Sequence, residues 1–256
     1  MGRIVFVSDV HLHLGGREYM EVFLGFLERV GGEAEAVYIH GDLFDFYVGH
    51  RQGRLPFYAP LFERLSDLVA KGVRVFVLGG NRDFLLGRLF RENGVEVIPD
   101  QTTLELGGRR VHLSHGDQFC IHDHSYLFWA RGVLRLPPIR FLVRNLPVSL
   151  AVWLARRYRG VSDRKRKRFA RRSRGRLPSI LDGVRLFHER DPHDVYICGH
   201  IHFLAETPIE AGGKEARLLT TGAWEDGPNC VLFDGEEFGI RRYDPHSGRL
   251  EPVSQA

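Results

Sequence analysis

Five short polar segments, each directly after an apolar run of the kind that forms a β-strand, constrain the fold of this chain more than any other feature. They are Asp9-Val10-His11, Gly41-Asp42-Leu43-Phe44-Asp45, Gly80-Asn81-Arg82-Asp83, His115-Gly116-Asp117 and Gly199-His200-Ile201-His202. In an α/β sheet the carboxyl ends of the strands share one edge, where ligands normally bind. We therefore expect the five segments to meet at one site.

The first hundred residues alternate between patterns typical of strands and of helices. Strands are expected at 4–8, 37–40 and 73–78, and helices at 18–30, 56–70 and 84–93. Alternation of this kind favours an α/β layer structure with parallel strand pairing. Further strands are expected at 95–98, 102–106, 110–114, 195–198, 203–208, 216–221, 230–233 and 238–243.

Between positions 123 and 190 the strand pattern disappears. Apolar residues with arginines interposed, broken by Pro137-Pro138, predict a helical insertion there. The expected organisation is a core made of residues 1–122 and 191–256, with a helical lid inserted at 123–190. Within the lid we expect Trp129 and Trp153 to be packing residues.

The residue types in the five segments suit divalent metal ions. Carboxylate, amide oxygen and imidazole are ligands for manganese, iron, zinc or magnesium. The i, i+2 spacing of Asp9 and His11, and of His200 and His202, places both side chains of each pair on one face at a strand end. Two metals lower the pKa of a shared water and clamp phosphate oxygens. The resulting hydroxide can attack phosphorus without a protein nucleophile, and no Gly-x-Ser-x-Gly motif supplies one.

This ordered set of motifs resembles the calcineurin-like metallophosphoesterase superfamily. The resemblance covers the whole α/β part and implies a four-layer α-β-β-α sandwich. It also implies that Asp42 bridges two ions, one held with Asp9, His11 and His202 and the other with Asn81, His115 and His200.

Arg82 departs from the broad superfamily pattern. Many members carry histidine after the asparagine, where it can donate a proton, whereas arginine stays charged. We expect Arg82 to act with Asn81 in catalysis by gripping phosphate oxygens and stabilising charge in the transition state. A good leaving group has less need of an acid, so this residue favours pyrophosphate cleavage over hydrolysis of an alkyl phosphate ester.

Longer strings narrow the resemblance. Gly80 to Gly87, Ser114 to Cys120 and Gly222-Ala223-Trp224 together resemble the UDP-2,3-diacylglucosamine pyrophosphohydrolases of lipid A biosynthesis. That family cleaves its substrate to 2,3-diacylglucosamine 1-phosphate (lipid X) and UMP, uses Mn²⁺, and lies peripherally on the cytoplasmic face of the bacterial inner membrane. The resemblance implies substrate contacts from Asn81, Arg82, Asp123, Tyr126 and His200.

A basic block lies inside the expected lid. Between 156 and 176 there are twelve Lys or Arg against one acid, Asp163, a net charge of +11 that leaves −7 on the rest of the chain. Such blocks usually meet phosphates of lipid or nucleic acid. With the implied diacylated UDP-sugar substrate, we expect an anionic membrane surface as partner and no nucleic acid. A solvated helix face, and a lid with its own small core, are the alternatives.

Two other functions fit parts of the pattern. The same core could serve another calcineurin-like phosphodiesterase or phosphatase acting on nucleotide or phosphoprotein substrates. A basic scaffold with a vestigial site would be non-enzymatic. The strand-like N-terminus indicates no signal peptide. The three cysteines, Cys120, Cys198 and Cys230, fit no zinc spacing and are expected to be reduced, as in the cytoplasm.

Overall fold

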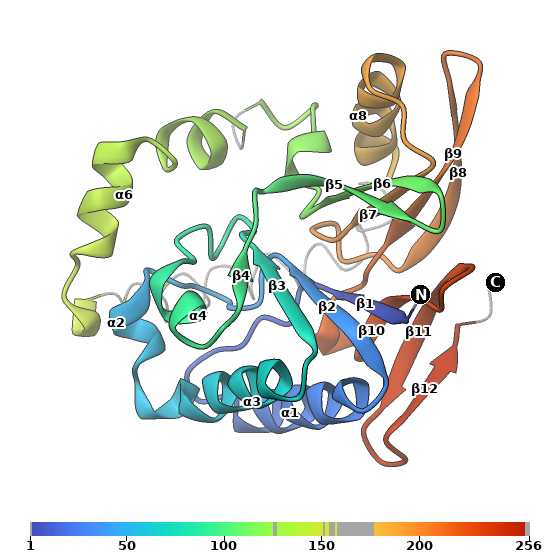
Figure 1. Ribbon diagram of the computed structural model, residues 1–256. Helices are drawn as coiled ribbons and strands as arrows, with labels where there is room; N and C mark the ends of the chain where they lie inside the picture. Colours follow the sequence, from blue (N-terminus) through green and yellow to red (C-terminus); the bar gives the residue numbers. More distant parts are fainter. Residues whose placement is uncertain (1, 125–126, 151, 154–156, 158–176, 254–256) are drawn as a thin grey trace.

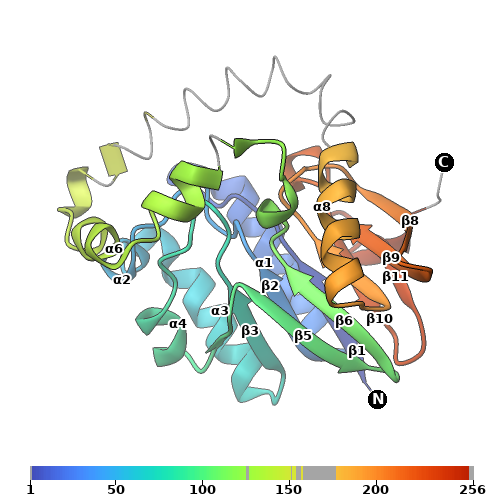
Figure 2. The ribbon, with the colours of Figure 1, turned by 90° about the horizontal axis from the view of Figure 1, so that it is seen from above.

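Two β-sheets lie face to face between helices in the computed structural model, which describes residues 2–124, 127–150, 152–153, 157 and 177–253 (Figures 1 and 2). The first sheet has the strand order β12-β11-β10-β1-β2-β3-β4 and the second β5-β6-β7-β9-β8. The first contains β1 (Arg3–Val7), β2 (Ala34–His40), β3 (Arg74–Leu78), β4 (Glu96–Val97), β10 (Asn229–Phe233), β11 (Phe238–Asp244) and β12 (Arg249–Pro252). The second contains β5 (Gln101–Leu106), β6 (Arg109–Ser114), β7 (Val195–Cys198), β8 (Ala205–Ala211) and β9 (Lys214–Thr220).

The centre of each sheet is parallel. Strands β1 to β4 pair in parallel in the first sheet, and β6, β7 and β9 do so in the second. Antiparallel strands extend both sheets outwards. The parallel pairing expected from the alternating pattern is confirmed, and all eleven expected strands form. Strand β12, which has no clear alternation of apolar residues, was not expected.

Four layers result from the way each strand uses its two faces. Val5 and Val7 of β1 pack under α1 (Arg17–Gly31) and α3 (Ala59–Ala70), while Ile4 and Phe6 pack against the second sheet. The alternation follows from the two-residue period of a strand. On the far side, α8 (Leu177–Arg190) covers the second sheet. Figure 1 shows the four layers from bottom to top: α1 with α3, the first sheet, the second sheet and α8. The expected α-β-β-α sandwich is confirmed.

Helix α8 lies inside the range expected for the lid. Its side chains Ile180 and Val184 are fully buried against Tyr196 and Cys198 of β7. This part of the range therefore contributes to the fourth layer, and the boundaries of the lid stay a prediction. The expected helix at 84–93 is shorter, since α4 (Arg88–Glu92) begins only after Gly87. The remaining short helices are α2 (His50–Gly53), η1 (Pro56–Tyr58), η2 (Asp117–Phe119) and η4 (Trp224–Asp226).

The described part of the lid exposes apolar side chains. A π-helix (Leu127–Val133) leads into α6 (Pro137–Arg144), which stands over α2 and α4 at one edge of the molecule (Figure 1). Trp129 and Trp153 are 61% and 55% exposed, so the expectation that they pack is wrong. Among the described residues, Trp129 has the Phe128 ring 5.4 Å away and Trp153 has the guanidinium of Arg157 5.9 Å from its ring centre, and neither is buried by these contacts. Across the described residues, no helix combines the length and apolar character needed to cross a membrane.

A histidine in β6 makes the stability of this fold depend on pH. His112 is buried, with its ring 4.8 Å from that of Phe187 and 5.6 Å from that of Phe119. Burial, with the nearby His193, lowers the pKa of His112 to about 4. The unfolded chain takes up this proton near pH 6.5 and the folded chain near pH 4, so stability falls as the pH falls through that window, by about 3 kcal/mol at most.

Replacing His112→Phe should flatten that dependence, because the ring of phenylalanine fits among aromatic neighbours and carries no proton. We expect urea unfolding of metal-stripped protein to show a smaller loss of stability between pH 7 and pH 4.5 in the variant than in the parent chain. An equal loss in both proteins would contradict this role of His112.

Candidate metal centre

The five polar segments meet where strands of both sheets end. Asp9, Asp42 and Asn81 follow β1, β2 and β3, while His115 and His200 follow β6 and β7. Backbone hydrogen bonds extend beyond the strands, from Asp9 N to the Gly41 carbonyl (3.1 Å) and from Gly199 N to the His115 carbonyl (2.9 Å). The shared sheet edge expected from the sequence is therefore present, and it is built from two sheets.

The backbone at this edge adopts an unusual conformation. Five non-glycine residues of the described chain have positive φ, and all five are predicted metal ligands: Asp9 (54°), His11 (54°), Asp42 (50°), His200 (67°) and His202 (55°). A left-handed backbone is uncommon for residues with a Cβ, although Asp and His tolerate it better than most. Such strain persists where the surroundings determine it and gathers at functional sites.

Two glycines allow the segments to approach one another. A Cβ on Gly80 would overlap the backbone nitrogen and carboxylate of Asp42, and one on Gly199 would overlap Asp9 and Ser8. Because backbone atoms form part of the obstacle at Gly80, the overlap there could not be relieved by turning a side chain alone. Each glycine thus lets a carboxylate lie against a neighbouring loop.

Three predicted ligands form the first cluster. The Nε2 atoms of His11 and His202 lie 3.0 Å apart, and Asp9 Oδ1 lies 3.2 Å from His202 Nε2 and 3.7 Å from His11 Nε2. Asp9 and His11 are buried, and Asp9 Oδ1 makes no well-formed hydrogen bond. Two imidazole nitrogens and a carboxylate oxygen that converge in this way match the donor set of a divalent cation.

The second cluster gathers around Asp42 and Asn81. Asp42 Oδ1 lies 3.6 Å from His115 Nε2, and Asn81 Oδ1 lies 3.0 Å from His115 Nε2 and 3.1 Å from His200 Nδ1. Ligand atoms of Asp9, Asp42 and His115 also lie within 4.8 Å of one another. Asp9 therefore lies near both clusters, whereas the resemblance assigned it to one ion only. The allocation of ligands to each ion stays a prediction.

The electrostatics of the buried carboxylates fit bound cations. Burial raises the pKa of Asp42, and burial together with the charge of Asp42 raises the pKa of Asp83 to about 7. Carboxylates crowded in a region of low dielectric repel each other unless positive charge lies between them. The donor chemistry, the burial and the converging atoms all fit two divalent ions.

Asp83 holds the metal-binding loops together. Its carboxylate accepts hydrogen bonds from the amides of Gly80 (2.8 Å), Asp42 (3.2 Å) and Phe44 (3.2 Å). It thus fastens the loop after β3 to the loop after β2. Because these bonds bind the chain at 80–83 into a compact loop, they also explain why the helix expected from residue 84 begins late.

Arg82, the predicted catalytic residue, lies at the rim of the second cluster. Its backbone N–H donates to Asp42 Oδ1 (3.0 Å), its Nε lies 3.4 Å from Asp42 Oδ2, and its guanidinium forms an ion pair with Asp45. The side chain is 16% exposed. The guanidinium is therefore oriented by two carboxylates and keeps access to solvent.

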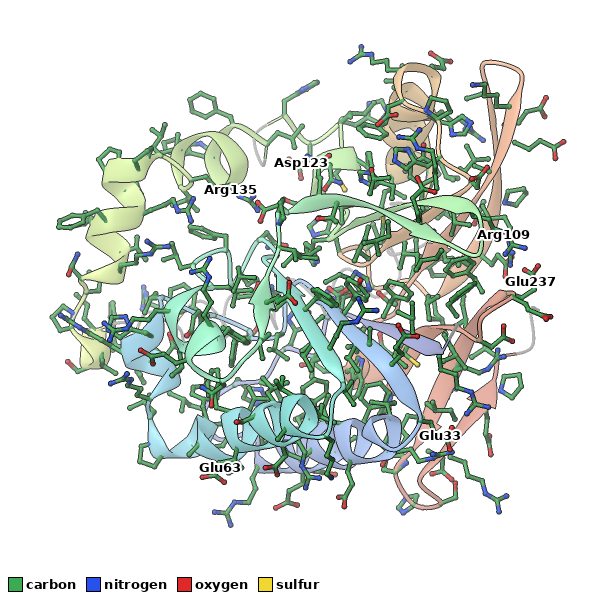
Figure 3. The ribbon with its side chains drawn as sticks, in the orientation of Figure 1. Glu33, Glu63, Arg109, Asp123, Arg135 and Glu237 are labelled. Carbon is green, nitrogen blue, oxygen red and sulfur yellow. The ribbon has the colours of Figure 1, made fainter. Side chains whose placement is uncertain are left out.

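The other predicted substrate contacts lie partly in the second cluster and partly in the lid. Asn81 and His200 lie in the second cluster. Asp123 is exposed at the start of the lid (Figure 3). Tyr126 and most of the basic block at 156–176 lie outside the described residues.

A sixth strand end supports the site and was not expected from the sequence. Thr221, directly after β9, has its Oγ1 2.6 Å from Ser8 Oγ, and Ser8 in turn donates to the Asp9 carboxylate. Trp224 N donates to the Asp9 carbonyl (3.1 Å). Ser8 and Thr221 are 213 positions apart, so no local pattern could pair them. The Gly222-Ala223-Trp224 string marked the region without giving this role.

Arg135 connects the lid to the metal-binding loops. Arg135, labelled in Figure 3, forms an ion pair with Asp100 and donates from Nη2 to the Gly80 carbonyl (3.3 Å). Its guanidinium lies 5.9 Å from the centre of the Phe84 ring. The side chain is only 16% exposed. One of many arginines in the lid sequence thus reaches the loop that carries Asn81, and the sequence offered no signal to single it out.

The family whose model matches this chain agrees with the names of its relatives. Residues 2–204 match the family described as calcineurin-like phosphoesterase. The chain is 34% identical over 230 residues to a UDP-2,3-diacylglucosamine hydrolase of Pseudomonas aeruginosa, covering 87% of this chain and 91% of the relative. It is 34% identical over 236 residues to a hydrolase of that name from Ectopseudomonas mendocina (92% and 96%), and 32% identical over 235 residues to one from Aeromonas salmonicida (91% and 91%).

The position of Asp42 between the clusters leads to a prediction about metal content. Asp42→Ala should lower bound metal below that of the parent protein and reduce turnover by at least a thousandfold, because it removes a donor next to both clusters. Elemental analysis and turnover would be measured together, with the exposed Asp67→Ala as control. Parental metal content and turnover in Asp42→Ala would refute the bridging role.

The contact between Arg135 and Gly80 leads to a second prediction. Arg135→Ala should lower kcat roughly tenfold, which corresponds to about 1.4 kcal/mol, because the Asn81 loop loses its support. Since Asp100 acts through Arg135, adding Asp100→Asn to that variant should cause little further loss. Independent, additive effects of the two substitutions would contradict the coupling.

Proposed function

This chain belongs to the calcineurin-like phosphoesterase family, and from that membership we propose that it hydrolyses the pyrophosphate bond of UDP-2,3-diacylglucosamine. The products are 2,3-diacylglucosamine 1-phosphate (lipid X) and UMP, and the pathway is lipid A biosynthesis. The observation that carries the proposal is the match along nearly the whole chain to relatives named for this substrate. The enzyme is a metal-dependent hydrolase.

We propose two Mn²⁺ ions as the cofactor. Asp9, His11, Asp42 and His202 would hold one ion, and Asp42, Asn81, His115 and His200 the other. When bound, such ions supply Lewis-acid activation of water and neutralise charge on phosphate oxygens. The carboxylate, amide and imidazole donors support manganese over softer metals, because no thiol joins these clusters in the described part of the chain.

Arg82 and Asn81 would act directly on the pyrophosphate. Asp42 and Asp45 fix the orientation of the Arg82 guanidinium, and its positive charge can stabilise the negative charge that develops on phosphate oxygens. Because arginine does not readily release a proton, it supplies charge rather than an acid. A nucleotide leaving group departs without protonation more readily than an alkoxide does, which suits cleavage of a pyrophosphate.

The lid would meet the lipid part of the substrate and the membrane. Phe128, Phe141 and Leu142 are 62%, 72% and 62% exposed, and these side chains would cost free energy in water unless lipid covers them. We therefore propose a peripheral position on the cytoplasmic face of the bacterial inner membrane. The positive charge of the lid sequence supports attraction to an anionic surface.

Turnover tests the substrate assignment. With purified protein and a panel of Mn²⁺, Mg²⁺, Zn²⁺ and Fe²⁺, we expect release of UMP from UDP-2,3-diacylglucosamine to be fastest with Mn²⁺. A UDP-sugar without acyl chains should be cleaved at least a hundredfold more slowly. Fast hydrolysis of bis(p-nitrophenyl) phosphate with no release of UMP would instead indicate a different phosphodiesterase.

Vesicle binding tests the membrane proposal. Phe128→Ser with Leu142→Ser should weaken cosedimentation with phosphatidylglycerol vesicles several-fold, because two exposed apolar groups no longer enter the lipid. Turnover of bis(p-nitrophenyl) phosphate should be unchanged. Leu186→Ser is the control, since Leu186 is 46% exposed on α8, which lies at the other edge of the molecule from α6 (Figure 1). Equal binding by all three proteins would rule out this lid surface.

A further inference from the structure

A pocket of about 680 Å³ lies between α4, the connection from β4 to β5, and the lid helix α6. None of the predicted metal ligands lines it. The loop that carries the predicted ligand Asn81 contributes Gly79 and Phe84 to the wall of the pocket. In Figure 1 this region lies at the edge of the molecule where α6 stands over α4. The volume is in the range of sites that bind small molecules.

Three arginines on this pocket lack an acidic partner. Arg91 comes from α4, and Arg140 and Arg144 come from α6, one helical turn apart. Within the described part of the chain none of the three forms an ion pair. Arg88, which lines the same pocket, forms an ion pair with Glu92, with Arg88 Nε 2.6 Å from Glu92 Oε1. The carboxylate of Asp100 also faces the pocket, but it is paired with Arg135.

The charges of Arg91 and Arg140 act on the guanidinium of Arg144. Burial lowers the pKa of Arg144, and the charges of Arg140 and Arg91 lower it further. Like charges at i, i+4 on a helix are mildly destabilising by themselves. The three arginines on α4 and α6 therefore repel one another, which costs free energy because no acid neutralises them. An anion bound between them would offset that cost.

The pocket is also lined by apolar side chains. Phe84, Leu86, Val97, Ile98 and Phe141 contribute to it, and Phe141 is 72% exposed. A lining that combines cationic and apolar side chains fits a ligand that carries both an anionic group and a hydrocarbon chain. Arginine suits phosphate in particular, because its planar guanidinium can donate two parallel hydrogen bonds to phosphate oxygens.

We propose that this pocket binds the head group of an anionic phospholipid, with the phosphate held by Arg91, Arg140 and Arg144 and the acyl chain against Phe84 and Phe141. The site is separate from the metal centre and does not depend on which phosphoester the enzyme cleaves. It would fix one edge of the lid to a single lipid molecule, in addition to the general attraction of the basic block to a charged surface.

Isothermal titration with dihexanoylphosphatidylglycerol, kept below its micelle-forming concentration, tests the proposal on the metal-loaded full chain. We expect Arg140→Gln with Arg144→Gln, and separately Arg91→Gln on α4, to weaken binding at least tenfold. Arg88→Gln should stay within twofold of the parent because its partner is Glu92. Unchanged affinity in the double variant and in Arg91→Gln would overturn the site.

Two further ligands separate the sources of binding. Dihexanoylphosphatidylcholine, whose head group has no net charge, should bind at least tenfold more weakly than dihexanoylphosphatidylglycerol, and equal binding would overturn recognition by charge. Inorganic phosphate that binds as tightly as the lipid would show a free-phosphate site and overturn the lipid assignment.

Turnover of bis(p-nitrophenyl) phosphate distinguishes this site from the metal centre. The arginine variants should keep parental turnover and should not lose thermal stability, since within the described residues none of the three arginines forms an ion pair with a metal-binding loop. Loss of lipid binding with turnover kept supports a separate site. A parallel loss of turnover in both variants would place the lipid at the metal centre and overturn the proposal.

Discussion

Left-handed backbone at five ligand positions is the constraint on which the rest of this structure depends. Each such residue costs on the order of 1 kcal/mol or more relative to an ordinary conformation, and all five lie in turns that leave a strand. The turns are secured by backbone bonds such as His11 N to the Asp42 carbonyl (3.0 Å) and by the Asp83 carboxylate. Two packed sheets supply the support, because turns from both meet at one edge.

The same constraint explains which parts of the site could be predicted from sequence. A ligand at a strand end is marked by the apolar run before it, so the positions of Asp9, Asp42 and His200 followed from local patterns. The pairing of Ser8 with Thr221 and the contact of Arg135 with Gly80 join segments that are distant in sequence. A single sequence carries no signal for such pairs, because a serine or an arginine alone fits many positions equally well.

Most of the fold could be predicted for a related reason, and the prediction failed in the lid. Strands of the parallel core carry dense apolar residues whichever layer they face, so β1, β2 and β3 were readable. In the lid the same apolar residues predicted packing, yet Trp129 and Trp153 are exposed. Apolar content shows that a side chain needs cover, but it does not show whether protein or lipid provides the cover.

Charge is distributed differently in the core and in the lid, in keeping with the metal centre and with the anionic-lipid site proposed above. In the core, buried carboxylates and imidazoles gather at the metal centre, and surface arginines such as Arg74 and Arg109 have acidic partners. In the lid, Arg140 and Arg144 have none within the described residues, and they lie beside exposed apolar groups. A cation site needs crowded donors on rigid strands, whereas recognition of an anionic amphiphile needs positive charge that no acid neutralises. Placing the second arrangement on an insertion lets both coexist, and Arg135 provides the direct contact through which the lid touches the loop of Asn81.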